Sequence, residues 1–406
     1  MVVYLDHAAT TPMLPDAIRA YAEALGVVGN PASIHSQGQA AKRMLEEARE
    51  QVAATLGCDP IEVVLTSGGT EAVNLAIKGI WWSRNRGGAR PVILAPGGEH
   101  HATIDTLEWL EQHEGAEVGW LPLDDDGLVH PDDVEAALTR YGDRVAMVTL
   151  LWANNEVGTI QPVTEISALA AAHGVPVHVD AVAAYGYLDT NFRAVRDASG
   201  SAGGAGLVAM SVSAHKIGGP VGVGALVLSR SASVEPLLHG GGQQRQVRSG
   251  TQDVAGAVSF AVAATFTTRN RAGEAVRLAA LRDRLIDGIL TAVPAARLNG
   301  LPGDGRLPGN VHVAFAGCEG DSLLFLLDMA GVSVSTGSAC QAGIPEPSHV
   351  LRAMGRSELE ARGALRVTLG HTTTEDDIDA LLAALPGAYT QASRAGFADR
   401  TTTLGA

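Results

Sequence analysis

Lys216 stands in a sequence where a lysine can act as a nucleophile. It follows a run of strand-forming residues and precedes the glycine-rich turn at residues 217–220. Such a position removes water from the amine and lowers its pKa, as a lysine that forms a Schiff base requires. The chain has two other lysines, Lys42 and Lys78, and both lie in helical patterns typical of solvent-exposed side chains. The alternative for Lys216 taken alone is a loop lysine that pairs with a carboxylate.

Asp180 ends the apolar run at residues 175–179, which predicts a buried strand. Ligands of open α/β sheets bind at the carboxyl ends of the strands, and a carboxylate there can pair with a protonated pyridine nitrogen. A helix N-cap is the alternative role for this aspartate. Asp180 precedes Lys216 by 36 residues, on what is expected to be another strand of the same sheet. The presence of both residues weakens the loop-lysine alternative and favours a site at the carboxyl ends of the strands.

The segment Ser67-Gly68-Gly69-Thr70 follows a short predicted strand and precedes a predicted helix. Small residues such as Gly69 and Thr70 let backbone N–H groups approach an anion, and a helix N-terminus attracts negative charge. An ordinary strand–turn–helix junction contains the same residue types, so this segment alone leaves both interpretations open. The chain has neither a GxGxxG segment opening a first βα unit nor a GxxxxGK[ST] segment, which disfavours nucleotide binding.

Cys340 is the cysteine best placed for chemistry. It lies among small and polar residues that offer no apolar pattern to bury it, and an exposed loop thiol is a candidate nucleophile. Cys58 follows a predicted helix end and Cys318 precedes a predicted helix cap, so we expect both to be structural. The three cysteines form no CxxC pair, which argues against a zinc site or a disulfide framework and favours a reducing cytoplasm.

His100 and His101 follow a predicted strand in the sequence GGEHHAT. A metal site would need further ligands, and the chain has no HExxH motif, so we expect no metal. Stacking of a histidine ring on a flat ligand is the functional interpretation. A plain loop histidine is the alternative.

Short apolar strands alternate with helices along the first part of the chain, which predicts a mostly parallel, doubly wound α/β sheet. The predicted strands are residues 62–66, 91–95, 117–121, 145–150, 175–179, 207–212 and 224–228. Predicted helices include residues 40–56, 71–82 and 163–173, and the small residues at 197–206 predict a loop.

The second part of the chain predicts a smaller α+β domain. A long helix from about residue 250 should end near Val293, because Pro294 cannot continue it. A strand at 310–315, a helix at 321–330 and a strand at 365–369 follow. We therefore predict a large domain of residues 15–255 and a small domain of residues 1–14 and 256–406.

Length and composition agree with two domains in one globular unit. The chain has 406 residues, of which 46% are hydrophobic and 18% charged, so it can bury a large core. Its formal charge of -15 argues against a nucleic-acid or anionic-membrane surface. No apolar run approaches the roughly 20 residues that span a bilayer, and the N-terminal residues lack the pattern of a secretory signal. We expect a cytoplasmic protein without direct nucleic-acid or membrane contacts.

Taken together, these segments resemble the class V aminotransferase family, and within it the cysteine desulfurases of the NifS/IscS type. The resemblance extends over nearly the whole chain. Its motifs are YLDHAATTP at 4–12, GNPAS at 29–33, TSGGTEAVNLAIKG at 66–79, EHHA at 99–102, NNEVGT at 154–159, HVDA at 178–181, SAHKIGGPVGVGAL at 213–226, HGGG and RSGT within 239–251, STGSAC at 335–340 and LRVTLG at 365–370.

This resemblance implies a fold-type I enzyme that uses pyridoxal 5′-phosphate (PLP). Carried over by motif, Lys216 would bind PLP covalently and act as a catalytic residue. Asp180 would contact the pyridinium nitrogen, and His100 would stack on the ring and take part in catalysis. The implied phosphate ligands are Gly69, Thr70, Ser213 and His215. Thr251 would reach the phosphate of the partner subunit, which implies a homodimer with shared sites.

The same resemblance implies that L-cysteine is converted to L-alanine. Asn155 would lie near the ring oxygen and the substrate, and Arg366 would bind the substrate carboxylate through two hydrogen bonds. Cys340 would attack the substrate sulfur and carry the resulting persulfide to an acceptor protein. The acceptor is left open among an iron–sulfur scaffold, a tRNA-thiolation relay and a biosynthetic partner.

Ala183 departs from the family pattern, because cysteine desulfurases usually have a glutamine three residues after the pyridine-contacting aspartate. Loss of one neutral hydrogen bond costs about 0.5–1.5 kcal/mol. The departure leaves open a PLP-dependent lyase acting on selenocysteine or another amino acid in specialised metabolism. A non-catalytic sulfur-transfer scaffold is a third alternative. It is disfavoured by the presence of the residues that the resemblance assigns to catalysis.

Overall fold

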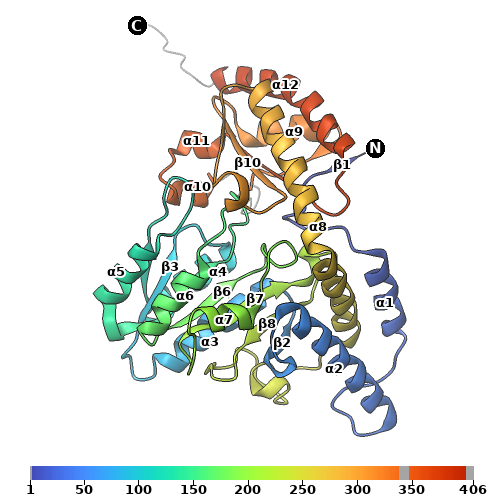
Figure 1. Cartoon of the computed structure of the whole chain (residues 1–406), viewed down its shortest axis with the longest axis vertical. Coiled ribbons are helices and arrows are strands. Elements are labelled where there is room, and N and C mark those ends of the chain that lie inside the picture. The colour runs from blue at the N-terminus through green and yellow to red at the C-terminus, as the bar shows by residue number, and fades with distance from the viewer. Residues whose placement is uncertain (1, 338–346, 399–406) are drawn as a thin grey trace.

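The computed structural model describes residues 2–337 and 347–398. Its larger unit is built on a seven-stranded sheet (Figure 1). The strand order is β2-β8-β7-β6-β5-β3-β4. Strands β3 to β7 pair in parallel, whereas β8 runs antiparallel to both of its neighbours. The strands are β2 Val63–Thr66, β3 Val92–Pro96, β4 Glu117–Leu121, β5 Val145–Leu151, β6 Pro176–Asp180, β7 Gly206–Ser213 and β8 Gly224–Leu228. The prediction of a mostly parallel sheet is confirmed.

Helices cover both faces of this sheet, as a doubly wound fold requires. Alternate strand residues point to opposite faces, so Val64 packs with the core of one face while Val63 and Leu65 pack with the other. Helices α3 (Gly69–Arg84) and α4 (His101–Glu114) contribute to the first core. The second core includes residues of α1 Pro15–Leu25, α2 Ser36–Leu56, α5 Pro131–Tyr141, α6 Val163–Ala172 and α7 Phe192–Ala198.

A smaller α+β unit packs around a separate hydrophobic core that includes Val313, Leu323 and Leu365. Its antiparallel sheet has the order β12-β10-β9, and β1 pairs in parallel with β11. The elements of this part are β1 Val3–Tyr4, β9 Ala296–Leu298, β10 Asn310–Phe315, α9 Gly320–Met329, β11 Val332–Ser333, α10 His349–Ala353, α11 Glu358–Arg362, β12 Ala364–Thr368 and α12 Glu375–Ala398.

Helix α8 (Val254–Ala292) runs from the large unit into the small one (Figure 1). It contributes to the large core through residues such as Phe260 and to the small core through residues such as Leu285. Its 39 residues span about 58 Å. The predicted boundary between residues 255 and 256 falls in its first turn, and the domain limits stay a prediction. The predicted helix end near Val293 is confirmed.

Several predicted limits were wrong by one to four residues, and the largest difference is in the helix predicted at 40–56, which begins at Ser36. The helix expected at residue 71 begins at Gly69, because Gly68 adopts a φ of 149° and ends the extended backbone there. The loop expected at 197–206 is shorter, since α7 includes Asp197 and Ala198 and β7 begins at Gly206.

The N-terminal segment, residues 3–14, connects the two parts. Its first residues pair with the small unit, where the Thr368 N–H donates to the Leu5 carbonyl at 2.8 Å. Its last residues contact the large unit, where the Thr11 N–H donates to the His215 carbonyl at 3.0 Å. One extended segment therefore contacts β12 and the turn that follows β7.

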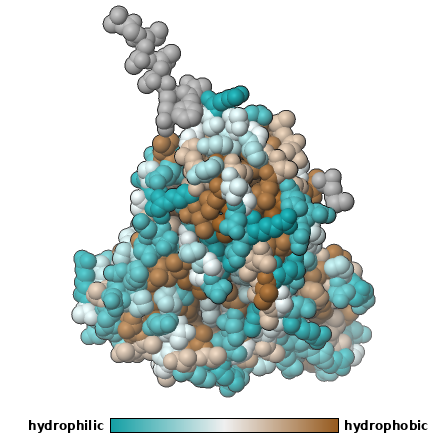
Figure 2. Space-filling view, turned by 45° about the horizontal axis from the view of Figure 1, so that its top comes forward, coloured by the Kyte–Doolittle hydropathy of each residue, from teal (hydrophilic) through white to brown (hydrophobic). Residues whose placement is uncertain are grey.

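Hydrophilic and hydrophobic side chains are interspersed on the face shown in Figure 2. Exposed large apolar side chains come from several elements, among them Ile34, Phe325 and Met329. Within residues 2–337 and 347–398, every helix is too short or too polar to span a lipid bilayer.

Substitution of Phe260 by alanine tests the packing of α8 on the sheet. Phe260 is fully buried and its ring lies 6.3 Å from that of Tyr185, so we expect a loss of about 3–5 kcal/mol in the free energy of unfolding. Phe266→Ala on the same helix is the control, because this side chain is 44% exposed and its loss should change the free energy by about 0.5 kcal/mol or less. Urea denaturation of both variants measures the difference, and equal losses would contradict the packing described.

Candidate active site

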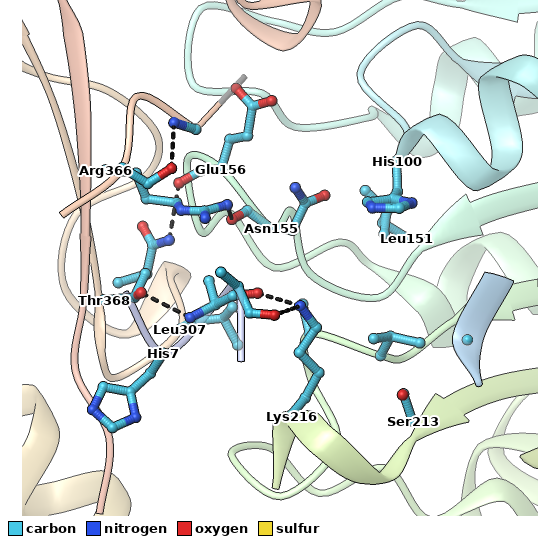
Figure 3. Close-up of a pocket in the computed structure, with 18 of the residues that line it drawn as sticks. His7, His100, Leu151, Asn155, Glu156, Ser213, Lys216, Leu307, Arg366 and Thr368 are labelled. Atoms are coloured by element: carbon cyan, nitrogen blue, oxygen red, sulfur yellow. Dashed lines mark hydrogen bonds between the residues drawn. The ribbon is translucent and has the colours of Figure 1, made fainter. Parts of the chain in front are cut away.

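A pocket of about 450 Å³ lies at the carboxyl ends of the parallel strands and is lined by residues of both units (Figure 3). This position is the usual ligand site of open α/β sheets. The pocket brings together most of the predicted site residues, namely Gly69, Thr70, His100, Asn155, Asp180, Ser213, His215, Lys216 and Arg366.

Lys216 follows β7 in a short 3-10 turn, Ala214–Lys216. Its Nζ donates hydrogen bonds to the backbone carbonyls of Ala8 and Ala9, the latter at 2.8 Å (Figure 3). Burial, with the nearby Arg366 charge, lowers the pKa of Lys216 from 10.5 to about 8, although Asp6 and Asp180 act in the opposite direction. About one amine in ten is therefore uncharged at pH 7 and able to attack a carbonyl carbon.

Asp180 is the last residue of β6, which pairs with β7, so it lies on another strand of the same sheet as expected. Its Oδ1 accepts a hydrogen bond from the Val182 N–H at 3.0 Å. Burial raises the pKa of Asp180 from 3.8 to about 6, although this hydrogen bond and the Lys216 charge lower it. The carboxyl group is therefore mostly ionised at pH 7 and can pair with a cationic ring nitrogen.

His100 is the N-cap of α4, and its Nδ1 accepts a hydrogen bond from the Ala102 N–H at 3.0 Å. Burial, with the Lys216 charge, lowers the pKa of His100 to about 4. Burial likewise lowers the pKa of His215 to about 4. Both rings are therefore uncharged at pH 7. A neutral, fixed imidazole such as that of His100 is suited to stack on a flat aromatic ligand.

Five residues that line the pocket have a buried polar atom without a hydrogen-bond partner among the described residues, and Ser213 Oγ and Asn155 Oδ1 are two of these atoms. Such atoms are uncommon in folded proteins and indicate a polar ligand that completes them. Ser213 lies close to the N-terminus of α3, because an added Cβ on Gly69 would approach the Ser213 Cβ within 3.7 Å. The free N–H groups of that helix end can bind a phosphate. These observations fit a phosphorylated ring such as PLP.

Arg366 lies on β12 and enters the pocket from the small unit (Figure 3). Its Nη1 donates to the Asn155 carbonyl at 3.1 Å, and its Nη2 lies 3.0 Å from Asp6 Oδ1. Its Nε is buried and has no partner in the described part of the chain. A guanidinium with free donors in a pocket is suited to bind a carboxylate.

His101, Glu156 and His349 also line the pocket, and the sequence predicted no function for the last two. His349 Nε2 contacts the Glu99 carbonyl at 2.7 Å, and its ring lies 4.6 Å from that of His101. Glu156 accepts a hydrogen bond from the Ser348 hydroxyl. His101 and Glu156 belong to the motifs EHHA and NNEVGT, but nothing in the sequence indicates that they meet His349.

Among the described residues, one predicted site residue does not line this pocket. Thr251 is exposed and follows the turn Gln244–Gln246, and its predicted contact with a partner subunit stays a prediction. Cys340 lies outside the described residues. The other two cysteines are buried, and burial raises the pKa of Cys58 to about 12 and that of Cys318 to about 11. Both are therefore poor nucleophiles, in agreement with their predicted structural role.

Ala183 lines the pocket next to Val182, so the position that departs from the family pattern faces the ligand space. Among the described residues, no group of three or more His, Cys, Asp or Glu side chains is arranged to hold a metal ion.

Comparison with known families agrees with this geometry. The family model described as "Aminotransferase class-V" matches residues 3–381. The chain belongs to this family. The match includes Lys216, Asp180 and Arg366, and it extends across both cores.

Individual members of the class V family are similar to the chain over nearly its whole length. An "IscS-like cysteine desulfurase" of Mycobacterium tuberculosis is 50% identical over 398 residues, 98% of this chain and 98% of the relative. A solved structure of a "NIFS-LIKE PROTEIN" has a TM-score of 0.86 at 32% identity and covers 96% of this chain and 100% of its own. Another, "SspA in complex with cysteine", has a TM-score of 0.75 at 30% identity and covers 90% and 98%.

The titration of Lys216 can be measured directly on cofactor-free protein. Only the uncharged amine reacts with an acylating reagent, so the labelling rate of Lys216 should rise with pH and reach half its maximum near pH 8. Mass spectrometry of the Lys216 peptide follows the rate, with the exposed Lys42 as reference. In Asp180→Asn the midpoint should move lower, because the carboxylate charge raises the pKa of Lys216. A wild-type midpoint near pH 10.5 would show that the surroundings of Lys216 do not lower its pKa.

Proposed function

We propose that this protein is a PLP-dependent cysteine desulfurase that converts L-cysteine to L-alanine and passes the sulfur to an acceptor protein. One observation supports this most strongly: the Lys216 amine, with a pKa of about 8, lies in a pocket that Asp180 and Arg366 also line. Lys216 can act as an amine nucleophile, Asp180 can pair with a cationic ring nitrogen, and Arg366 can bind an amino-acid carboxylate. Near-complete similarity to proteins named cysteine desulfurases supports the same reaction.

The residues that would hold PLP come from separate strands and helices of the large unit. Lys216 would bind the aldehyde carbon, Asp180 the ring nitrogen, and His100 one face of the ring. Gly69, Thr70, Ser213 and His215 would hold the phosphate. Bound PLP supplies an electron sink for charge at the substrate Cα.

Arg366 and Lys216 would orient and deprotonate the amino-acid substrate. The guanidinium binds the α-carboxylate, with Asn155 beside it. The amine of Lys216, once released, is a base of suitable pKa for the Cα proton at neutral pH. Because the neutral His100 and His215 add no charge, the carboxylate is attracted chiefly by Arg366.

Cys340 would receive the sulfur. Its thiolate attacks the substrate sulfur, an S–S bond forms, and the C–S bond breaks with its electron pair left on the substrate carbon. Protonation of that carbon gives L-alanine, and Cys340 retains a persulfide for an acceptor protein. The burial of Cys58 and Cys318 supports this assignment.

A homodimer would complete the phosphate site through Thr251. The segment that carries Thr251 is attached to α3, because Arg248 Nε donates to Glu71 Oε1 at 2.8 Å. The same helix begins at the phosphate-binding turn. This contact places the segment that carries Thr251 against α3, and the second subunit itself is proposed from the family resemblance.

Two substitutions test the reaction. Lys216→Ala should lose the absorbance of lysine-bound PLP and lower alanine formation by at least about 10²–10⁴-fold, since it removes both the attachment point and the base. Cys340→Ala should keep that absorbance and lose alanine formation. Cys58→Ala is the matched control and should retain activity within a few-fold. Alanine is measured by chromatography. Wild-type rates in Lys216→Ala would sink the proposed function, and wild-type rates in Cys340→Ala would sink the sulfur acceptor role.

The position of Ala183 favours one second candidate, a PLP-dependent lyase that acts on selenocysteine or another amino acid. Without a glutamine side chain, the space beside the cofactor is larger. A substrate panel with a thiol reductant present, scored for alanine and for sulfide or selenide, distinguishes the candidates, because a dedicated desulfurase is expected to turn over L-cysteine fastest.

Substitution of Ala183 by glutamine measures what the departure costs. One restored hydrogen bond should tighten PLP binding by about two- to tenfold, equivalent to about 0.5–1.5 kcal/mol. Ala183→Leu adds similar bulk without a donor and should bind PLP no more tightly than wild type. Fluorescence titration of the cofactor-free variants gives the dissociation constants. Equal affinity of the Gln and Leu variants would show that no such bond forms.

A further inference from the structure

Asp6 forms an ion pair with Arg366 although the two residues are 360 positions apart in the chain. The Asp6 Oδ1 and Arg366 Nη2 atoms are separated by 3.0 Å, and the side chains are 20% and 7% exposed. A nearly buried guanidinium needs a partner to compensate its lost hydration. Asp6 is the carboxylate in contact with Arg366 in the described structure, and it has no role in the proposed reaction.

The backbone fixes Asp6 against the strand that carries Arg366. Asp6 forms a parallel bridge with Thr368 of β12. The Ala8 N–H donates to Thr368 Oγ1 at 2.8 Å, and the His7 N–H donates to the Thr368 carbonyl at 3.3 Å. The Asp6 carboxylate therefore has little freedom to move relative to Arg366.

Two contacts determine how the guanidinium is oriented. Nη2 is held by Asp6, and Nη1 donates to the Asn155 carbonyl at 3.1 Å. A planar group held at two nitrogens cannot rotate freely, and it retains three of its five N–H donors for a ligand. Loss of Asp6 would leave a single contact, and the remaining donors would no longer point in one direction.

The segment that contains Asp6 also contacts Lys216, whose Nζ donates to the carbonyls of Ala8 and Ala9. An α-amino acid with its carboxylate on Arg366 must present its Cα to Lys216, so the relative placement of the two side chains matters. We propose that Asp6 is a positioning residue that holds Arg366 in the orientation required to bind the α-carboxylate of the substrate. This inference rests on the proposed function for its substrate class.

The test compares ligands with and without a carboxylate on PLP-loaded protein. In Asp6→Ala, KM for L-cysteine and the calorimetric Kd for L-alanine should rise roughly tenfold or more, the usual effect of losing a charge-assisted hydrogen bond. The kcat should stay within about threefold, because the Lys216 amine keeps its place and loss of the Asp6 charge only lowers its pKa further. Inhibition by cysteamine, which is cysteine without its carboxylate, should keep its wild-type Ki. Asp6→Asn retains an oxygen acceptor and should restore KM to within about threefold.

Matched variants separate this role from a structural one. Asp16→Ala removes an exposed carboxylate that pairs with Arg19 at 2.7 Å, and it should leave every constant unchanged. In an Arg366→Ala background, Asp6→Ala should add no further loss of L-alanine affinity, because it acts through Arg366. Should Asp6→Ala be too unstable to purify, Asp6→Glu displaces the carboxylate and should raise the L-alanine Kd at least threefold.

Wild-type L-alanine affinity in folded Asp6→Ala, or an equal loss of cysteamine and L-alanine binding, would overturn the inference. Failure of the proposed function has a different signature. In that case wild-type protein would release no alanine from L-cysteine, while the calorimetric comparison of L-alanine binding would still report on Asp6.

Discussion

Lys216, Asp180 and Arg366 are three ionisable groups that line one pocket, and the rest of the site depends on how their charges balance. Burial alone favours the uncharged amine, and the Arg366 charge acts in the same direction, whereas Asp180 and Asp6 favour the ammonium form. The result is a pKa of about 8, close enough to neutrality for one group to serve as nucleophile and base. A more exposed lysine would be almost fully protonated, and one without nearby carboxylates would be harder to bury.

This balance requires two separately packed units to meet at a fixed distance. Lys216 and Asp180 come from adjacent parallel strands of the large sheet, whereas Arg366 comes from an antiparallel strand of the small unit. Helix α8 packs in both cores, and the N-terminal segment forms hydrogen bonds with both. The N-terminal segment lines the pocket at residues 7–9, so it contributes to the chemistry as well as to the packing.

The sequence predicted the elements well where local physics determines them. Short apolar runs indicated the strands, and the parallel β4 and the antiparallel β8 and β10 have the limits that these runs predicted. The strand order and the antiparallel direction of β8 depend on pairing between distant segments, for which the sequence holds no local signal. Lys216 and Asp180 were predictable because ligand sites lie at strand ends. Arg366, Asn155 and Ser213 came from the family resemblance alone. The ion pair between Asp6 and Arg366 could not be predicted, since neither residue's neighbours indicate the other. Thr251 depends on a second subunit and Cys340 lies outside the described residues, so their roles stay predictions.

Single-turnover mass spectrometry tests most directly whether Lys216 chemistry delivers sulfur to Cys340. PLP-loaded protein is mixed with one equivalent of L-cysteine, quenched with an alkylating reagent and digested. We expect the Cys340 peptide to gain one sulfur atom while one equivalent of alanine forms, and the peptides of Cys58 and Cys318 to remain unchanged. Alanine formed at the same rate with no sulfur on the Cys340 peptide at any time would contradict the assignment.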